Sequence, residues 1–272
     1  MPRFKAVFLC FMGDARGLIC LSMSAGGPPV VPPTGAVNPY SPPASSIEGA
    51  GFQLGAVPGF KSASGLANAI AVVLGAEAIG KALVAVNAYL TIGVMERISG
   101  GEEIPREQLV AIDMRSQGLA VLGLVTLVAA AVLFCIFMVR ANRNARSFGA
   151  TLANTPGWAA GWFFVPFASL WKPYYAMKEI WQGSDAEAVA SLNPPVPALL
   201  PLWWWAFILH NLVGGALSQG SGRAHGPEGL ISTSRMLIVS SVVTIVAAVL
   251  AIMVAKQLAR RQDRRASAAA AR

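Results

Sequence analysis

Four polar side chains lie inside otherwise apolar stretches of this sequence, and they are the first candidates for chemistry. Glu77 and Lys81 interrupt one long apolar segment, and His210 and Asn211 interrupt another. On a helix, the i, i+4 spacing of Glu77 and Lys81 brings a carboxylate and an ammonium group together on one face. An imidazole takes up and releases protons near neutral pH. Because such groups are costly inside a bilayer, the four residues form a candidate intramembrane polar site.

Each of the two pairs also has a structural interpretation, and the sequence leaves both interpretations open. Glu77 and Lys81 can neutralise each other without serving a ligand. His210 and Asn211 can hydrogen-bond a neighbouring helix, where Gly214–Gly215 would allow two backbones to approach closely. The alternative is that the polar groups line a path or a ligand site.

The sequence lacks the other patterns of a catalytic or metal site. It contains only two histidines, and Cys10, Cys20 and Cys135 have no paired spacing that suits zinc or a redox couple. A nucleophile elbow, a phosphate-binding loop and a cluster of carboxylates are all missing. We therefore expect a protein that is not an enzyme and that needs no cofactor or metal.

The composition indicates a membrane protein. Hydrophobic residues make up 55% of the 272 residues, and charged residues only 12%. The formal net charge of +8 comes from basic residues that flank apolar segments. This pattern favours anchoring at a membrane surface over binding of nucleic acid.

Four apolar segments approach or exceed the length of about 20 residues that a bilayer span needs; they are 66–95, 118–139, 199–217 and 230–255. Basic clusters follow the second and fourth segments, and they comprise Arg140, Arg143 and Arg146, then Lys256, Arg260, Arg261, Arg264 and Arg265. Such clusters stay in the cytoplasm and attract anionic lipid, so we expect both on that side. The net acidic segment 96–117 is expected on the other side.

A tryptophan-rich stretch at 157–181 is apolar, but Pro166 divides it and Lys172-Pro173 ends it. Its unbroken apolar part is too short for a span. Since two cytoplasmic basic clusters require an even number of crossings between them, this stretch is predicted to turn back. The predicted fold is an all-α polytopic membrane helical bundle with four spans and a re-entrant or interfacial Trp/Pro-rich helical element.

Two further expectations concern the aromatic residues. After Pro173, a helix is expected to lie in the membrane interface with Tyr174, Met177 and Trp181 on one face. Trp203–Trp205 are expected to form an aromatic belt at one end of a span.

The remaining segments set the domain organisation. Residues 1–64 are predicted to form a disordered Gly/Pro/Ala/Ser-rich tail, residues 65–258 the membrane domain, and residues 259–272 a basic C-terminal tail. The start resembles a signal peptide, but charged residues at Asp14 and Arg16 interrupt it, and a natural start at Met23 is an alternative.

Three motifs carry a resemblance to a known family: RANRNARSFGA at 140–150, PGWAAGWFFVPFASLWKPYYAMKEIW at 156–181 and WWWAFILHN at 203–211. In this combination the chain resembles the bacterial membrane family catalogued as domain of unknown function 4328, over roughly residues 66–258. The resemblance marks as signature positions Asn144, Arg146, Trp158, Trp162, Pro166, Trp171, Pro173, Trp203, Trp204 and Asn211. It implies a multi-span membrane protein and supplies no activity. The third tryptophan, Trp205, departs from the pattern.

Two functions are consistent with these features. The first is a small membrane scaffold or sensor whose flexible tails bind protein partners or lipids. The alternative is a small transporter or channel-like protein with a polar intramembrane site. In both cases we expect a multi-pass protein of the bacterial inner membrane, the cell membrane, with cytoplasmic N- and C-termini. The oligomeric state stays open.

Overall fold

The computed structural model describes residues 57–185, 195–221 and 226–271, and these residues form helices and connecting turns. Four helices are long: α1 (Ser64–Ser99), α2 (Arg106–Ser147), α5 (Leu199–Ser221) and α6 (Gly226–Ala270). Between α2 and α5 lie the short helix α3 (Pro156–Gly161), the 3₁₀ turns η1 (Trp162–Phe164) and η2 (Ala168–Leu170), and helix α4 (Lys172–Gly183). No strand occurs in this described part of the chain.

The four long helices are apolar and long enough to cross a membrane, which confirms the predicted all-α bundle with four spans. Each begins or ends outside the predicted apolar segment. The clearest case is α2, which begins at Arg106, directly after Pro105. Segment 96–117 is therefore mostly helical, and the loop within it shortens to Gly100–Pro105.

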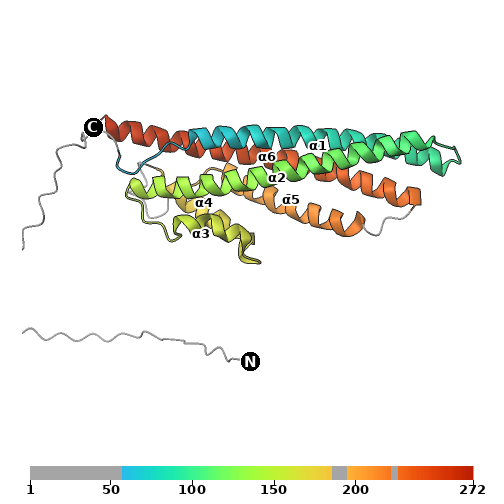
Figure 1. Cartoon of the computed structure of the whole chain (residues 1–272). Helices are drawn as coiled ribbons and strands as arrows, with labels where there is room; N and C mark the ends of the chain where they lie inside the picture. The colour runs from blue at the N-terminus through green and yellow to red at the C-terminus, as the bar shows by residue number, and fades with distance from the viewer. Residues whose placement is uncertain (1–56, 186–194, 222–225, 272) are drawn as a thin grey trace, which may run out of the picture. The chain divides into compact units, whose positions relative to one another are not determined.

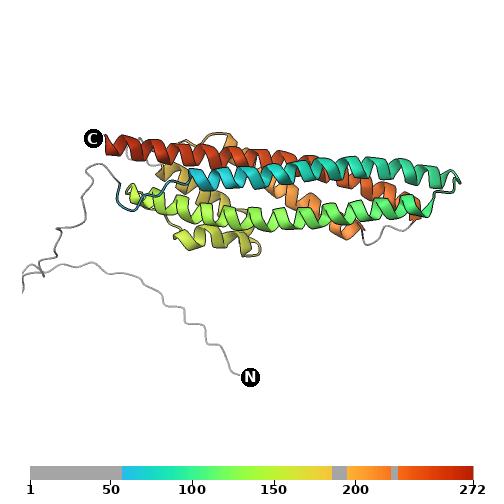
Figure 2. The ribbon, with the colours of Figure 1, turned by 45° about the horizontal axis from the view of Figure 1, so that its top comes forward.

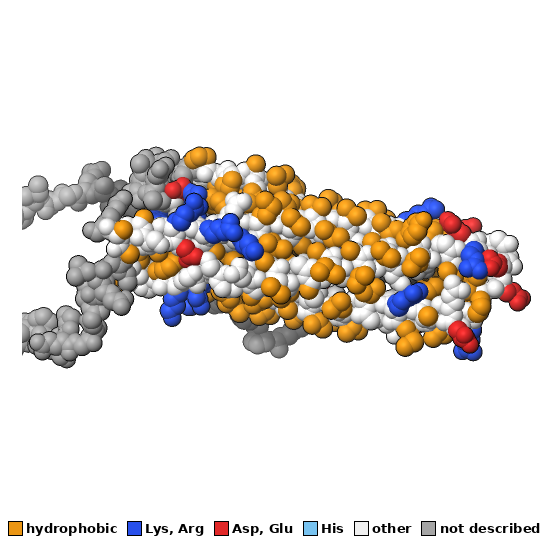
Figure 3. Space-filling model, turned by 90° about the horizontal axis from the view of Figure 1, so that it is seen from above, with side chains coloured by type: hydrophobic (Ala, Val, Ile, Leu, Met, Phe, Trp, Pro, Cys, Tyr) orange, Lys and Arg blue, Asp and Glu red, His pale blue; other side chains and the backbone are white. Residues whose placement is uncertain are grey.

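Helix α1 packs along both α2 and α6, and α5 packs on α6. Successive long helices run in opposite directions, as Figures 1 and 2 show. Near the end of α6, the Gln262 side-chain amide donates to the Ala141 carbonyl of α2 at 2.9 Å. The two basic clusters therefore lie at the same end of the bundle, which we call the basic end. The opposite end, at Gly100–Pro105, is called the loop end. Hydrophobic side chains cover the surface between them (Figure 3).

The tryptophan-rich stretch does not form a span-length helix, as predicted. Helix α3 is capped by Thr155, whose hydroxyl accepts from the Trp158 amide at 3.4 Å, and it ends after six residues. The chain then reverses at Phe167, which has a φ of 61°, while the Ala168 amide donates to the Pro166 carbonyl at 2.7 Å. This hydrogen bond closes a three-residue turn that is strained for a residue with a bulky side chain. Both arms of the stretch pack on α2.

The apolar face of α4 packs against protein within the bundle, and the position of the helix in a membrane interface stays a prediction. Met177 and Trp181 are buried in the main hydrophobic core, together with Ile180. Tyr175, on another face of the helix, is 53% exposed. Burial occurs because α4 packs on α2 near the basic end, so the predicted face meets the bundle and not the lipid.

The predicted aromatic belt is also wrong for two of its three tryptophans. Trp203 and Trp204 are only 2% and 6% exposed, whereas Trp205 is 69% exposed. The Trp204 indole donates to the Leu170 carbonyl at 3.1 Å. The returning arm of the tryptophan-rich stretch thus provides the hydrogen-bond acceptor for the Trp204 indole, a donor that in an aromatic belt would bond to water or lipid headgroups.

The basic C-terminal residues are part of the bundle, which corrects the assignment of 259–272 to a flexible tail. Helix α6 continues to Ala270, with Leu258, Ala259 and Gln262 buried. Their spacing keeps one face of the helix against α1 and α2, while the arginines occupy the other faces. At the N-terminal side, residues 1–56 and the predictions about them lie outside the described residues. Within the described part, Ala63 is already fully buried.

A glycine on α4 gives a test of this packing. A methyl group at Gly183 would lie 2.8 Å from Ala150 Cβ and 3.1 Å from Leu152 Cδ2. We expect Gly183→Ala to lower the free energy of unfolding by about 1–3 kcal/mol, the usual cost of overpacking. Thermal unfolding in detergent measures this change.

Gly214→Ala is the matched control. A methyl group there meets no heavy atom within 4 Å, and the same holds at Gly215, so the expected close backbone approach is not present in the described part of the chain. We expect this variant to unfold at or slightly above the wild-type temperature, because alanine favours a helix over glycine by about 1 kcal/mol. Equal stability of the two variants would contradict the packing of α4.

Candidate functional site

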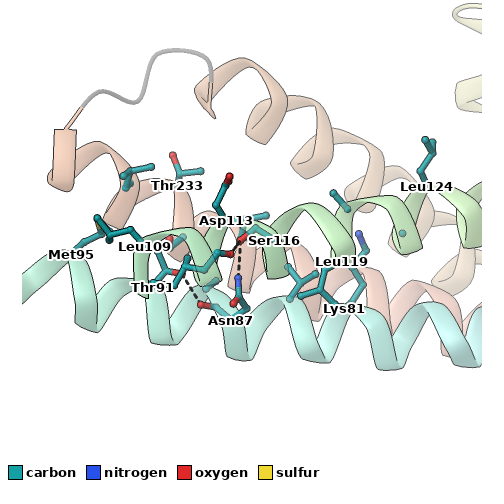
Figure 4. A pocket seen from close by; sticks show the side chains of 18 of the residues that line it. Lys81, Asn87, Thr91, Met95, Leu109, Asp113, Ser116, Leu119, Leu124 and Thr233 are labelled. Carbon is teal, nitrogen blue, oxygen red and sulfur yellow. Dashed lines mark hydrogen bonds between the residues drawn. The ribbon is translucent and has the colours of Figure 1, made fainter. Parts of the chain in front are cut away.

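A groove of about 950 Å³ opens between α1, α2 and α6 and extends towards the loop end (Figure 4). We call it the loop-end groove. Its polar lining comprises Glu77, Lys81, Asn87, Thr91, Asp113, Ser116, His210, Thr233 and Ser234. Apolar residues such as Met95, Leu109, Leu119 and Leu237 separate these groups. A pocket of this volume, mostly apolar with a few placed polar groups, is typical of a small-molecule site.

The carboxylate of Glu77 lies at the inner end of the groove. The residue is only 8% exposed, and its Oε1 lies 3.5 Å from the Lys81 Nζ. Thr126 of α2 donates a hydrogen bond to the other carboxylate oxygen. The ion pair and the hydroxyl together compensate a charge that would otherwise be unfavourable at this depth. Sequence reasoning missed Thr126, although it is the one hydroxyl residue in the apolar run 118–139.

His210 reaches the same groove from α5, and Asn211 does not. The His210 Nδ1 lies 3.0 Å from the Thr244 hydroxyl, which itself donates to the Ser240 carbonyl at 2.8 Å. Which of these two groups donates depends on the tautomer of the imidazole ring. Asn211 is exposed and donates to the Phe207 carbonyl of its own helix at 2.7 Å. Adjacent residues on a helix point about 100° apart, which separates the two side chains.

Midway along the groove, Asn87 provides a free acceptor. Its amide nitrogen donates to the Ser116 hydroxyl at 2.9 Å, and Thr91 donates to the Asn87 backbone carbonyl at 2.8 Å. The Asn87 Oδ1 is buried and has no hydrogen-bond partner among the described residues. Sequence reasoning missed Asn87 and Thr91. Both follow Glu77 and Lys81 at helical spacing on one face of α1, so extending that face towards the C-terminus of the helix would have found them.

The charges of the lining favour one kind of ligand. Among the described lining residues, two carboxylates, Glu77 and Asp113, accompany one ammonium, Lys81, so their formal charge is −1 with His210 neutral. Acceptor oxygens outnumber free donors, since Lys81 is already paired. This lining suits a molecule with an apolar body and a cationic or hydrogen-bond-donating head. Among the described residues, no three His, Cys, Asp or Glu side chains gather in a way that suits a metal ion.

The groove is closed towards the basic end. There the main core fills the bundle with side chains that have no exposed surface, including Ile70 of α1, Phe137 and Met138 of α2, and Val254 of α6. A molecule that enters from the loop end therefore reaches Glu77 and meets packed side chains beyond it.

The signature residue Asn144 lies far from the groove and joins three parts of the chain at the basic end. Its amide nitrogen donates to the Lys61 carbonyl and to Gln262 Oε1, both at 2.9 Å, and its Oδ1 accepts from the Lys61 amide at 3.2 Å. Gln262 in turn donates to the Ser184 hydroxyl at 2.9 Å. Asn144 is fully buried, so these hydrogen bonds fasten α2 to α6 and to the segment before α1.

Arg146 fastens the connection between α2 and α3. It donates to Asn142 Oδ1 at 3.0 Å and to the carbonyls of Leu152 and Asn154 at 2.9 and 2.8 Å. Asn154 Oδ1 accepts from the Trp162 indole at 2.7 Å. Arginine suits this position because its planar head presents several donors at fixed angles.

The other signature residues divide between buried and exposed positions. Trp203, Trp204 and Pro173 are buried. Trp158 stacks on Trp162 with ring centroids 4.7 Å apart, and the Lys172 ammonium lies 5.4 Å from the Trp162 ring. Pro166 and Trp171 are exposed near the turn of the tryptophan-rich stretch. Most of the signature residues therefore hold the fold together. None of them lines the groove, but His210, the neighbour of the signature residue Asn211, does.

A family model described as Domain of unknown function (DUF4328) matches residues 101–260. This range includes every signature residue and begins after α1, so it is shorter than the expected range of 66–258, and Glu77 and Lys81 precede it. No curated protein matches the chain. No solved structure matches it either.

Proposed function

Because this chain belongs to the family described as Domain of unknown function (DUF4328), and that description gives no activity, we propose a function from the loop-end groove. The protein is a membrane-embedded sensor that binds a small amphipathic molecule. Its bound head group interacts with Glu77, Asn87 or Asp113, and its apolar body lies against the leucine-rich lining. The role is not enzymatic.

The observation that carries this proposal is the combination of a buried carboxylate and an unpaired acceptor in one groove. A satisfied structural ion pair would need no space around it, yet Glu77 and Lys81 border a cavity. No described residue is a hydrogen-bond partner of the Asn87 Oδ1, and a ligand or water in the groove would supply one. Both features favour a binding site over a purely structural pair.

The orientation follows from the two basic clusters at one end of the bundle. We propose that the basic end faces the cytoplasm of a bacterial cell and contacts anionic lipid, with both termini on that side. The groove then opens to the outside. Since α1 and α6 line the groove and continue to the basic end, a change in their spacing would reach residues 57–63, the described segment before α1. A scaffold with two free tails is less well supported, because α6 includes residues up to Ala270.

Blocking the groove tests the proposal. Ser116→Trp places an indole in the groove, and Val121→Trp, at a 63% exposed position of the same helix outside the lining, is the matched control. We expect the wild type and Val121→Trp to release the same small molecule when they are purified in nanodiscs and then denatured, and Ser116→Trp to release at least about tenfold less. Mass spectrometry identifies the molecule. Identical release from all three proteins would argue against the groove as the binding site.

Transport is the second candidate, because intramembrane ionisable residues also mark ion and substrate paths. The closed inner end of the groove favours binding over conduction. We expect liposomes with wild type or Glu77→Gln to show the same background proton flux, reported by a pH-sensitive dye inside the vesicles. A flux in the wild type that Glu77→Gln abolishes would favour a transporter.

A further inference from the structure

A second cavity, of about 530 Å³, lies at the basic end, away from the loop-end groove. It is lined by Trp181, Gln257, Arg260, Arg261, Asp263 and Arg264, and we call it the arginine pocket. The sensor function proposed above does not use these residues.

Two of the arginines have no counter-ion in the part of the chain that the structure describes. Arg260 and Arg264 are exposed and lie four residues apart on α6, an arrangement of like charges that is unfavourable by itself. In the described ranges the structure gives neither residue an ion pair. Arg264 only donates to the backbone carbonyl of Arg260, at 3.4 Å. Their guanidinium groups are available to an external anion.

The third arginine is held in place. Arg261 forms an ion pair with Asp185, and its guanidinium carbon lies 5.5 Å from the Trp181 ring centroid. Its Nε is buried without a hydrogen-bond partner. The acid in the lining, Asp263, accepts from the Ser64 hydroxyl with one carboxylate oxygen. The pocket therefore keeps an excess of positive charge and unused donors.

The residues that precede the pocket on α6 show what kind of anion would fit. Val242, Val246, Val249 and Met253 are exposed apolar residues at helical spacing, and the same face continues through Gln257 to Arg260 and Arg264. An apolar stripe on one helix face thus leads directly to guanidinium groups and an indole. Figure 3 shows basic side chains where the hydrophobic surface ends. This order matches that of a phospholipid, with acyl chains below and a phosphate at the interface.

We propose that the arginine pocket binds the phosphate of an anionic phospholipid headgroup, while the acyl chains lie along the exposed stripe of α6. Guanidinium groups pair with phosphate oxygens through two parallel hydrogen bonds, and Trp181 provides an amphipathic wall at headgroup depth. The site rests on the membrane placement of the basic end and is independent of the ligand in the loop-end groove.

The test measures lipid retention by the full-length protein after extraction from vesicles of phosphatidylcholine and phosphatidylglycerol. We expect the wild type to retain phosphatidylglycerol in native mass spectra. We expect Arg260→Gln/Arg264→Gln to retain at least about tenfold less of this lipid, which is the loss expected when charge-assisted hydrogen bonds are removed. Arg140→Gln/Arg143→Gln removes the same charge at the same end outside the pocket, and we expect it to retain wild-type amounts.

A third variant, Arg260→Lys/Arg264→Lys, keeps the charge and the helix and is expected to lose retention in part, because lysine lacks the paired donors. It keeps the proposal testable if the glutamine variant fails to fold. Equal losses in the pocket and control variants would overturn the proposal in favour of a diffuse positive field. Displacement of the lipid by excess inorganic phosphate would overturn it in favour of a soluble anion.

Discussion

Asn144→Ala is expected to lower the free energy of unfolding by about 3 kcal/mol. The substitution removes three hydrogen bonds and leaves Gln262 Oε1 and the Lys61 backbone groups without this partner. Each buried polar group that loses its partner costs about 1–3 kcal/mol, and water cannot enter a site with no exposed surface without a rearrangement. Unfolding followed by helical circular dichroism in lipid bicelles measures the change.

Asn211→Ala is the control for this prediction. Asn211 is exposed and donates only to its own helix, so we expect a change within about 0.5 kcal/mol. The contrast separates the two asparagines, which the family resemblance placed on an equal footing. If Asn144→Ala lowers the free energy of unfolding no more than Asn211→Ala does, the contact between α2, α6 and the segment before α1 does not hold the basic end together.

Glu77→Gln is expected to lower the free energy of unfolding by about 3 kcal/mol. This is close to the free-energy penalty of an unpaired lysine at the centre of a span. The reason is that the substitution leaves Lys81 without its carboxylate partner, which lies 3.5 Å away in the wild type. The loss should appear as a lower unfolding free energy in bicelles. Asp113→Asn removes an exposed carboxylate from the outer part of the same groove, and we expect it to cost less than about 0.5 kcal/mol.

A double-mutant cycle shows whether the loss comes from the pair. Lys81→Met alone leaves the Glu77 carboxylate with Thr126 as its remaining partner, whereas Glu77→Gln/Lys81→Met leaves no charge at all. We expect the double variant to be at least about 1 kcal/mol more stable than the sum of the two single losses predicts. Strict additivity would mean that the two charges do not interact at this depth.

The sequence was sufficient to predict the four spans and the returning tryptophan-rich stretch, because hydropathy, proline positions and basic flanks are local properties of the chain. The family was identified by the resemblance of three motifs. The sequence was not sufficient to predict what covers each aromatic ring. Trp204 is amphipathic whether it meets lipid or the Leu170 carbonyl, and only the tertiary fold decides between these environments. The face of α4 around Met177 was predicted correctly as apolar, but its partner was not.

The C-terminal part of α6 was missed for a related reason. Its many arginines suggested a solvated tail, but Leu258, Ala259 and Gln262 continue the buried face of the helix into this segment. Of the four residues predicted for the candidate site, Glu77, Lys81 and His210 line the groove and Asn211 does not. Asn87 and Thr126 were not predicted, because a single uncharged polar residue in an apolar helix is a weak sign of a binding site.

We infer that the loop-end groove is open to water on the side of the membrane opposite to the basic end. This inference is tested most directly by cysteine labelling in a background where Cys10, Cys20 and Cys135 are replaced by serine. Asn87→Cys lies in the groove. Val86→Cys lies about 1.5 Å away along the helix axis, at a position that is 57% exposed and outside the groove lining. We expect a membrane-impermeant maleimide added outside intact cells to label Asn87→Cys and not Val86→Cys. Equal labelling of both variants, or labelling of Asn87→Cys only in inverted vesicles, would contradict it.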